Sequence, residues 1–75
     1  MWNVMEAEYP TCDLGFRLAK PIDFGSLRQA TDYVAKAITK YEVVDVWGFD
    51  RQITIVVKKP ESKGKIHWTI SPADD

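Results

Sequence analysis

The sequence predicts a small α+β domain: a two-layer arrangement in which one helix packs on one face of an antiparallel-rich sheet. Three observations predict it. Apolar residues repeat at helical spacing between Ser26 and Tyr41, alternating apolar segments lie on both sides of that helix, and 75 residues allow one core. The expected element order is β-α-β-β-β, or β-β-α-β-β-β if the N-terminal residues add a strand. Residues 1–75 are therefore expected to form a single domain.

Residues 1–13 are expected to contain an edge strand followed by a turn. Met5, Ala7 and Tyr9 alternate with glutamates, and Pro10 begins a stretch of turn composition. An alternative is that residues 1–9 fold over the second face of the sheet. Residues 14–20 alternate more regularly and predict a strand that ends before a proline.

Residues 24–41 predict an amphipathic helix. Two N-caps fit its start: Ser26 would form a capping box with Gln29, whereas Asp23 would form a hydrophobic staple from the apolar residues around it. One face of the helix is apolar and is expected to lie on the sheet; its residues are Leu27, Ala30, Val34, Ala37, Ile38 and Tyr41.

Three strands and a short acidic tail are predicted after the helix, at residues 43–48, 52–59, 65–70 and 71–75. The first hairpin is expected to turn at Asp50 and Arg51. Because this dipeptide suits a tight type I′ turn poorly, Gly48 is expected to mark a bulge or a longer loop. The second hairpin turns through Pro60 to Gly64.

The register predicted for these hairpins places apolar residues opposite one another on one face. The pairs are Val46–Ile55, Val44–Val57, Val57–Ile66, Ile55–Trp68 and Ile53–Ile70, with Glu42–Lys59 at the outer end. The helix is expected to cover this whole face.

The opposite face is then expected to be open, with an apolar centre inside a polar and charged rim. A large aromatic residue in such surroundings is typical of a protein-binding patch. An alternative is that residues 1–9, or a bulge at Gly48, bury the ring of Trp47. The predicted protein-binding residues are Trp47, Phe49, Val56, His67, Arg17 and Lys58.

A cluster of lysines on the second hairpin suggests an alternative, single-stranded nucleic-acid binding. The lysines would contact phosphates while bases stack on Trp47. A charged hairpin tip is more commonly just solvated, and a net charge of −1 argues against a dedicated duplex DNA binder. The candidate nucleic-acid-binding residues are Lys58, Lys59, Lys63 and Lys65.

Residues that could perform catalysis are sparse. Cys12 and His67 are the one potential nucleophile and base pair, and no third residue is positioned to orient the histidine. Asp45 shares the open face with His67 but lies two strand spacings away, about 9–10 Å. Neither metal-ligand spacing nor a glycine-rich loop is present. We therefore expect no catalytic residue, metal site or cofactor, and no enzyme.

The function that these observations favour is a non-enzymatic module that docks on a larger protein. An accessory factor, an inhibitor or an antitoxin-like regulator would fit, including one encoded by a phage or another mobile element. A homodimer and a structural subunit of a larger assembly are alternatives. A single cysteine indicates a reducing compartment, and neither a membrane-spanning run nor a secretory signal is visible, so we expect a cytoplasmic protein.

Overall fold

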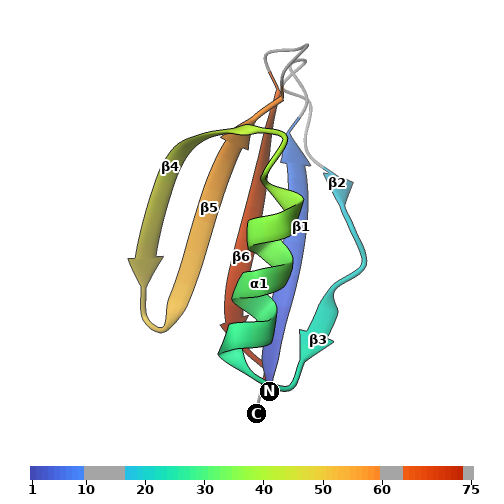
Figure 1. The fold of residues 1–75 in the computed structure, drawn as a ribbon, viewed down its shortest axis with the longest axis vertical. Coiled ribbons are helices and arrows are strands. Elements are labelled where there is room, and N and C mark those ends of the chain that lie inside the picture. Colours follow the sequence, from blue (N-terminus) through green and yellow to red (C-terminus); the bar gives the residue numbers. More distant parts are fainter. Residues whose placement is uncertain (10–16, 60–63, 74–75) are drawn as a thin grey trace.

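A computed structural model describes residues 1–9, 17–59 and 64–73. Its helix packs on one face of an antiparallel six-stranded sheet, which confirms the predicted α+β class (Figure 1). The order is β-β-β-α-β-β-β, with three strands before the helix where one, or alternatively two, were predicted. The elements are β1 (Trp2–Tyr9), β2 (Arg17–Leu18), β3 (Ile22–Phe24), α1 (Leu27–Ala37), β4 (Glu42–Phe49), β5 (Gln52–Lys58) and β6 (Lys65–Pro72).

The N-terminal strand β1 lies inside the sheet, whose order is β2-β1-β6-β5-β4 with β3 also paired to β1. It pairs with β6 over its full length, from Trp2 opposite Pro72 to Tyr9 opposite Lys65. The predicted edge position is therefore wrong, and so is the alternative that residues 1–9 cover the second face. Pairing on both sides satisfies the backbone polar groups of β1, which a segment lying across the face would leave open.

The segment predicted as one strand at residues 14–20 is divided. Its described part holds β2, and β3 follows after Pro21; both run antiparallel to β1. Proline has no N–H to give to a ladder, which accounts for the break. Residues 14–16 lie outside the described residues. At the other end of the chain, β6 continues through Pro72, so part of the predicted acidic tail is strand.

The helix begins at the Ser26 cap, one of the two predicted starts. Ser26 has an extended backbone, and its side chain accepts a hydrogen bond from the N–H of Gln29 at 3.2 Å. The Gln29 side chain in turn accepts from the N–H of Gly25 at 3.0 Å. Two N–H groups that lack helical partners are thereby satisfied. Asp23, the alternative cap, lies in β3 instead.

The helix is shorter than the predicted 24–41. It ends at Ala37, and the N–H of Ile38 is shared between the carbonyls of Val34 and Lys36 as the chain turns toward β4. Tyr41 lies beyond the helix but still packs on the core, with its ring 5.9 Å from that of Trp68.

The core lies between α1 and the central strands. The backbone of the helix approaches β1, β3 and β6, and Val57 of β5 joins the same core. Trp68, which is 3% exposed, lies at the centre of this layer. The buried core residues are Val4, Ala30, Val34, Val57, Ile66, Trp68 and Ile70. Leu27 belongs to the predicted apolar face of the helix but stays exposed.

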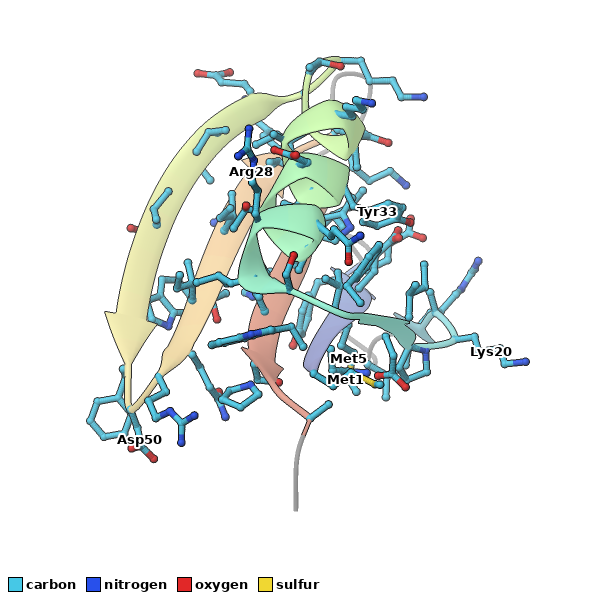
Figure 2. The ribbon with its side chains drawn as sticks, turned by 60° about the horizontal axis from the view of Figure 1, so that its bottom comes forward. Met1, Met5, Lys20, Arg28, Tyr33 and Asp50 are labelled. Atoms are coloured by element: carbon cyan, nitrogen blue, oxygen red, sulfur yellow. The ribbon has the colours of Figure 1, made fainter. Side chains whose placement is uncertain are left out.

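The hairpin between β4 and β5 closes with a two-residue turn. Asp50 and Arg51 both have positive φ, 51° and 68°, as a type I′ turn requires, and Phe49 pairs with Gln52. Figure 2 shows Asp50 at the tip of this hairpin. The longer loop predicted at Gly48 is therefore wrong. The register does place Val46 opposite Ile55 as predicted.

A bulge lies elsewhere, between Val43 and Asp45, and it moves the outer part of the hairpin by one residue. Val43 takes the place predicted for Val44, opposite Val57. Glu42 consequently lies opposite Lys58 and not Lys59. The second hairpin has the predicted register, with the pairs Val57–Ile66, Ile55–Trp68 and Ile53–Ile70.

Removal of the helix cap should weaken the fold. We expect Ser26→Ala to lower the free energy of unfolding by about 1 kcal/mol, because the N–H of Gln29 loses its acceptor. In a domain of this size that is roughly 4–8 °C in melting temperature. Thermal unfolding followed by circular dichroism measures it. Ser26→Asp should retain nearly all of the stability, and an equal loss in both variants would contradict the capping role.

Candidate protein-binding surface

The edge strand β4 is exposed along all eight residues although it is largely apolar. Its five large apolar side chains remain 44–80% exposed: Val43 44%, Val44 44%, Val46 56%, Trp47 45% and Phe49 80%. We call these five side chains, together with the outer edge of the strand, the β4 surface. Isolated exposed apolar residues are ordinary, but a whole apolar edge strand is a recognised association site.

The β4 surface has apolar groups on both faces of the sheet. Val46 pairs with Ile55 on the helix side, whereas Trp47 pairs with Thr54 on the opposite face, which we call the open face. The predicted cover of Val46 by the helix is wrong, because Val46 is 56% exposed and the backbone of α1 does not approach that of β4. Figure 2 shows Arg28 on the flank of the helix toward β4, and the two remain apart.

Trp47 is turned away from the helix, as predicted, but it is not isolated. Its ring contacts the ring of His67 edge-on, with centroids 6.0 Å apart. Since β5 lies between β4 and β6, the indole must reach across β5 to make this contact. This explains why Val56 and Thr54, on the same face of β5, are buried. Trp47 therefore shields β5 with one side and meets solvent with the other.

The remaining predicted contact residues separate into two groups. Phe49 and Lys58 lie on the open face with Trp47, and His67 lies there between Trp47 and Tyr9, whose ring is 4.5 Å away. Val56 is 4% exposed, so it supports the surface from below and cannot itself contact a partner.

Arg17 lies elsewhere, which corrects its predicted place at the rim of the open face. It pairs with Glu8, and Glu8 pairs with the core residue Ile66. Residues opposite one another share a face, so Arg17 is on the helix side, at the edge of the sheet opposite β4.

The open face near Trp47 is weakly charged. Burial lowers the pKa of His67, and the positive charge of Lys65 lowers it further, so this imidazole is neutral at pH 7. Asp45 pairs with Val56, which separates it from His67 as the sequence predicts. Its carboxylate instead accepts a hydrogen bond from the N–H of Val46 at 2.8 Å. The hydroxyl groups of Thr54 and Thr69 are hydrogen-bonded to each other at 3.2 Å.

The lysines of the second hairpin are partly neutralised. Lys59 donates to the carboxylate of Glu8 and forms an ion pair with it. Lys58 lies between Glu42 and Lys65 on the open face. Lys63 lies outside the described residues. This arrangement leaves less free positive charge for phosphates than the sequence cluster suggests.

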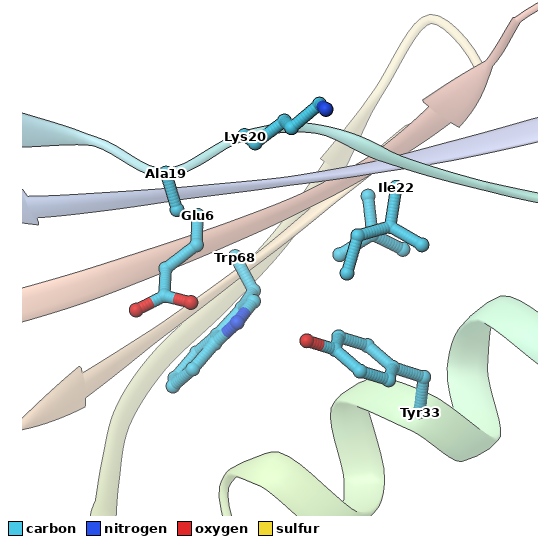
Figure 3. A pocket seen from close by; sticks show the side chains of 7 residues that line it. Glu6, Ala19, Lys20, Ile22, Tyr33 and Trp68 are labelled. Carbon is cyan, nitrogen blue, oxygen red and sulfur yellow. The ribbon is translucent and has the colours of Figure 1, made fainter.

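A small cavity of about 50 Å³ lies behind the helix, between β1, β6 and the segment around β3 (Figure 3). The indole Nε1 of Trp68 is buried and finds no hydrogen-bond partner within the described residues. Figure 3 shows that nitrogen on the side of the ring toward Tyr33. The volume suits one or a few water-sized molecules and is too small to enclose a larger substrate. Sequence reasoning did not find this cavity, because its walls come from four separate segments.

Metal and nucleophile sites require His, Cys, Asp or Glu side chains that lie close together. Within residues 1–9, 17–59 and 64–73, no group of three or more His, Cys, Asp or Glu residues could hold a metal ion. Cys12 lies outside the described residues, so the expectation that it forms no catalytic pair with His67 stays a prediction. Over the same described ranges, no helix has the length and apolar character that a membrane crossing demands.

Comparisons of the chain with protein-family models, with curated proteins and with solved structures found no match.

Three substitutions should separate the roles of the aromatic residues. Trp68→Ala should lower the free energy of unfolding by about 3–5 kcal/mol, since it leaves a large cavity in the core. Trp47→Ala should lower it by about 2 kcal/mol, because half of the ring is buried over β5. Phe49→Ala should stay within about 0.5 kcal/mol of the native protein. Urea unfolding measures all three, and a Trp47 loss as large as that of Trp68 would contradict the partial exposure.

The Glu8–Lys59 pair should make stability depend on pH. The hydrogen bond and charge of Lys59 hold the pKa of Glu8 below its usual value. A lowered pKa stabilises the fold above the unfolded pKa, about pH 4.3, and that contribution is lost as pH falls through the folded pKa. The melting temperature of Glu8→Gln should therefore lie below that of the native protein at pH 7, and the difference should shrink as the pH falls below the unfolded pKa of glutamate. A difference that does not shrink with acidification would show that the ion pair is not its source.

Proposed function

We propose that this protein is a non-enzymatic binding module that docks on a larger protein through the β4 surface and the adjoining open face. The observation that carries the proposal is the exposure of β4, an edge strand with five large apolar side chains. Burial of apolar area is the dominant favourable term in protein association. One cysteine and no disulfide framework fit an action in the cytoplasm.

The size of the surface supports a modest but specific interface. The exposed parts of two aromatic rings and three valines amount to an area on the order of 500 Å². A standard interface buries about 800 Å² on each partner, so neighbouring polar groups of the open face would complete it. Phe49 is 80% exposed at the end of β4 and is the side chain best placed to enter a partner's pocket.

Single-stranded nucleic-acid binding is a second proposal with narrower support. Lys58 and Lys65 lie side by side on the open face, and Trp47 offers a ring for stacking on the same face. Glu42 beside Lys58 and the Glu8 partner of Lys59 oppose it. Affinity for short oligonucleotides that falls steeply with salt would favour this function over protein docking.

Docking can be tested by comparing two substitutions of exposed apolar residues. Phe49→Ser alters the β4 surface, and Leu18→Ser removes another exposed apolar side chain at the opposite edge of the sheet. Each variant is immobilised, and proteins captured from the native host are identified by mass spectrometry. A partner retained by Leu18→Ser and reduced about tenfold by Phe49→Ser is the expected result.

Equal capture by both variants would place the contact elsewhere and contradict docking through β4. Circular dichroism of the two proteins is the control, because each substitution is at an exposed position and should leave the fold intact.

A further inference from the structure

The outer edge of β4 has backbone groups available for another strand. No described strand pairs with that edge, since the sheet order ends at β4. Phe49 and Gln52 close the two-residue turn as a hydrogen-bonded pair, and such pairs alternate along an antiparallel ladder. The N–H groups of Gly48 and Val46 therefore point away from β5, toward solvent.

One of these outward N–H groups already has a hydrogen-bond acceptor within the chain. The carboxylate of Asp45 accepts a hydrogen bond from the N–H of Val46 at 2.8 Å. The carboxylate thus stands where the carbonyl oxygen of an added strand would lie. Natural edge strands are commonly protected by charged side chains, most often lysine. Here the protecting group is an acid that caps the backbone directly.

The charge of Asp45 has no nearby compensation among the described residues of its row. Across the open face its row continues through Val56 to His67, which is neutral at pH 7. The other acids at this edge have a basic residue beside them: Glu42 lies opposite Lys58, and Asp50 is followed in sequence by Arg51. A partner with a positive charge opposite Asp45 would therefore be complementary.

We propose that the outer edge of β4 receives an extended segment of the partner protein as an additional antiparallel strand, with a lysine or arginine opposite Asp45 and apolar residues beside Val46 and Trp47. This inference rests on the proposed docking function and specifies how docking occurs. The carbonyl of the added strand takes over the N–H of Val46. The released Asp45 carboxylate then pairs with the cation, while main-chain hydrogen bonds supply affinity.

A second copy of this chain fits the edge less well. Antiparallel pairing of two β4 strands about Asp45 sets the two carboxylates against each other. Pairing about Val46 sets Glu42 of one copy opposite Asp50 of the other. Like charges directly opposite destabilise a ladder, and neither register brings a cation to Asp45. The segment of a different, cationic partner is therefore the occupant that the charges favour.

A synthetic peptide provides the test. The sequence of residues 52–59 already matches β4 in register, so we use acetyl-QITIKVKK-amide, in which lysine replaces Val56 and falls opposite Asp45. The control is acetyl-QITIEVEE-amide. We expect the lysine peptide to bind about tenfold more tightly than the glutamate peptide, and less tightly as salt rises. Titration by NMR should shift the amide signals of Val46 and Gly48 and slow their hydrogen exchange.

Variants of the full chain separate strand addition from general apolar contact. Val46→Pro removes the outward N–H, and proline is tolerated in an edge strand. Val46→Thr keeps the N–H and exchanges one methyl group for a hydroxyl group of similar size. Binding of the lysine peptide should be lost in Val46→Pro and retained within about threefold in Val46→Thr. Asp45→Asn keeps a cap for Val46 but removes the charge, and it should weaken binding by about threefold.

The outcomes distinguish this inference from the proposed function. If Val46→Pro still captures the cellular partner that Phe49→Ser loses, docking through β4 stands and strand addition is overturned. Equal binding of the two peptides, or unchanged peptide binding in Val46→Pro, also overturns it. Sedimentation that shows the native protein dimerising, with the dimer lost in Val46→Pro and no peptide bound, would assign the edge to a second copy instead.

Discussion

A single helix is too narrow to cover this sheet, and that mismatch determines the rest of the molecule. An α-helix with its side chains is about 10–12 Å wide, which spans little more than two strands at about 4.8 Å spacing. The helix α1 lies over β1 and β6, with β3 closing one flank. Figure 1 shows β4 lying outside the cover of the helix, and this strand is exposed along its whole length, whereas Val57 of β5 still reaches the core.

The covered half of the sheet supplies the stability. Here β1 and β6 form an eight-residue ladder, and their inward residues meet Ala30 and Val34 of the helix. Trp68 fills the centre of this layer with one indole nitrogen directed at a small cavity. In a chain of 75 residues the apolar core is limited, so each of these buried side chains contributes a large part of the total stability.

The uncovered half supplies the surface. Trp47 has two roles there, because it shields Val56 and Thr54 on β5 and still presents a ring to solvent. An edge of this kind would associate without selectivity if its backbone were free. Asp45 limits this by capping the N–H of Val46, and the same carboxylate gives the edge a preference for positive charge. In the proposed strand addition, protection of the edge and recognition of the partner would both depend on this one side chain.

The sequence by itself determined the local elements whose signals are local. Alternation fixed the register of the second hairpin, and the Ser26–Gln29 spacing located the start of the helix, because caps and pairing depend on residues close in the chain. The same alternation correctly predicted that the side chain of Trp47 points away from the helix. The tertiary structure alone decided that β1 lies inside the sheet, that α1 leaves Val46 uncovered, and that Arg17 lies at the far edge. These depend on strand order and on the width of one helix relative to a six-stranded sheet, which no periodicity encodes.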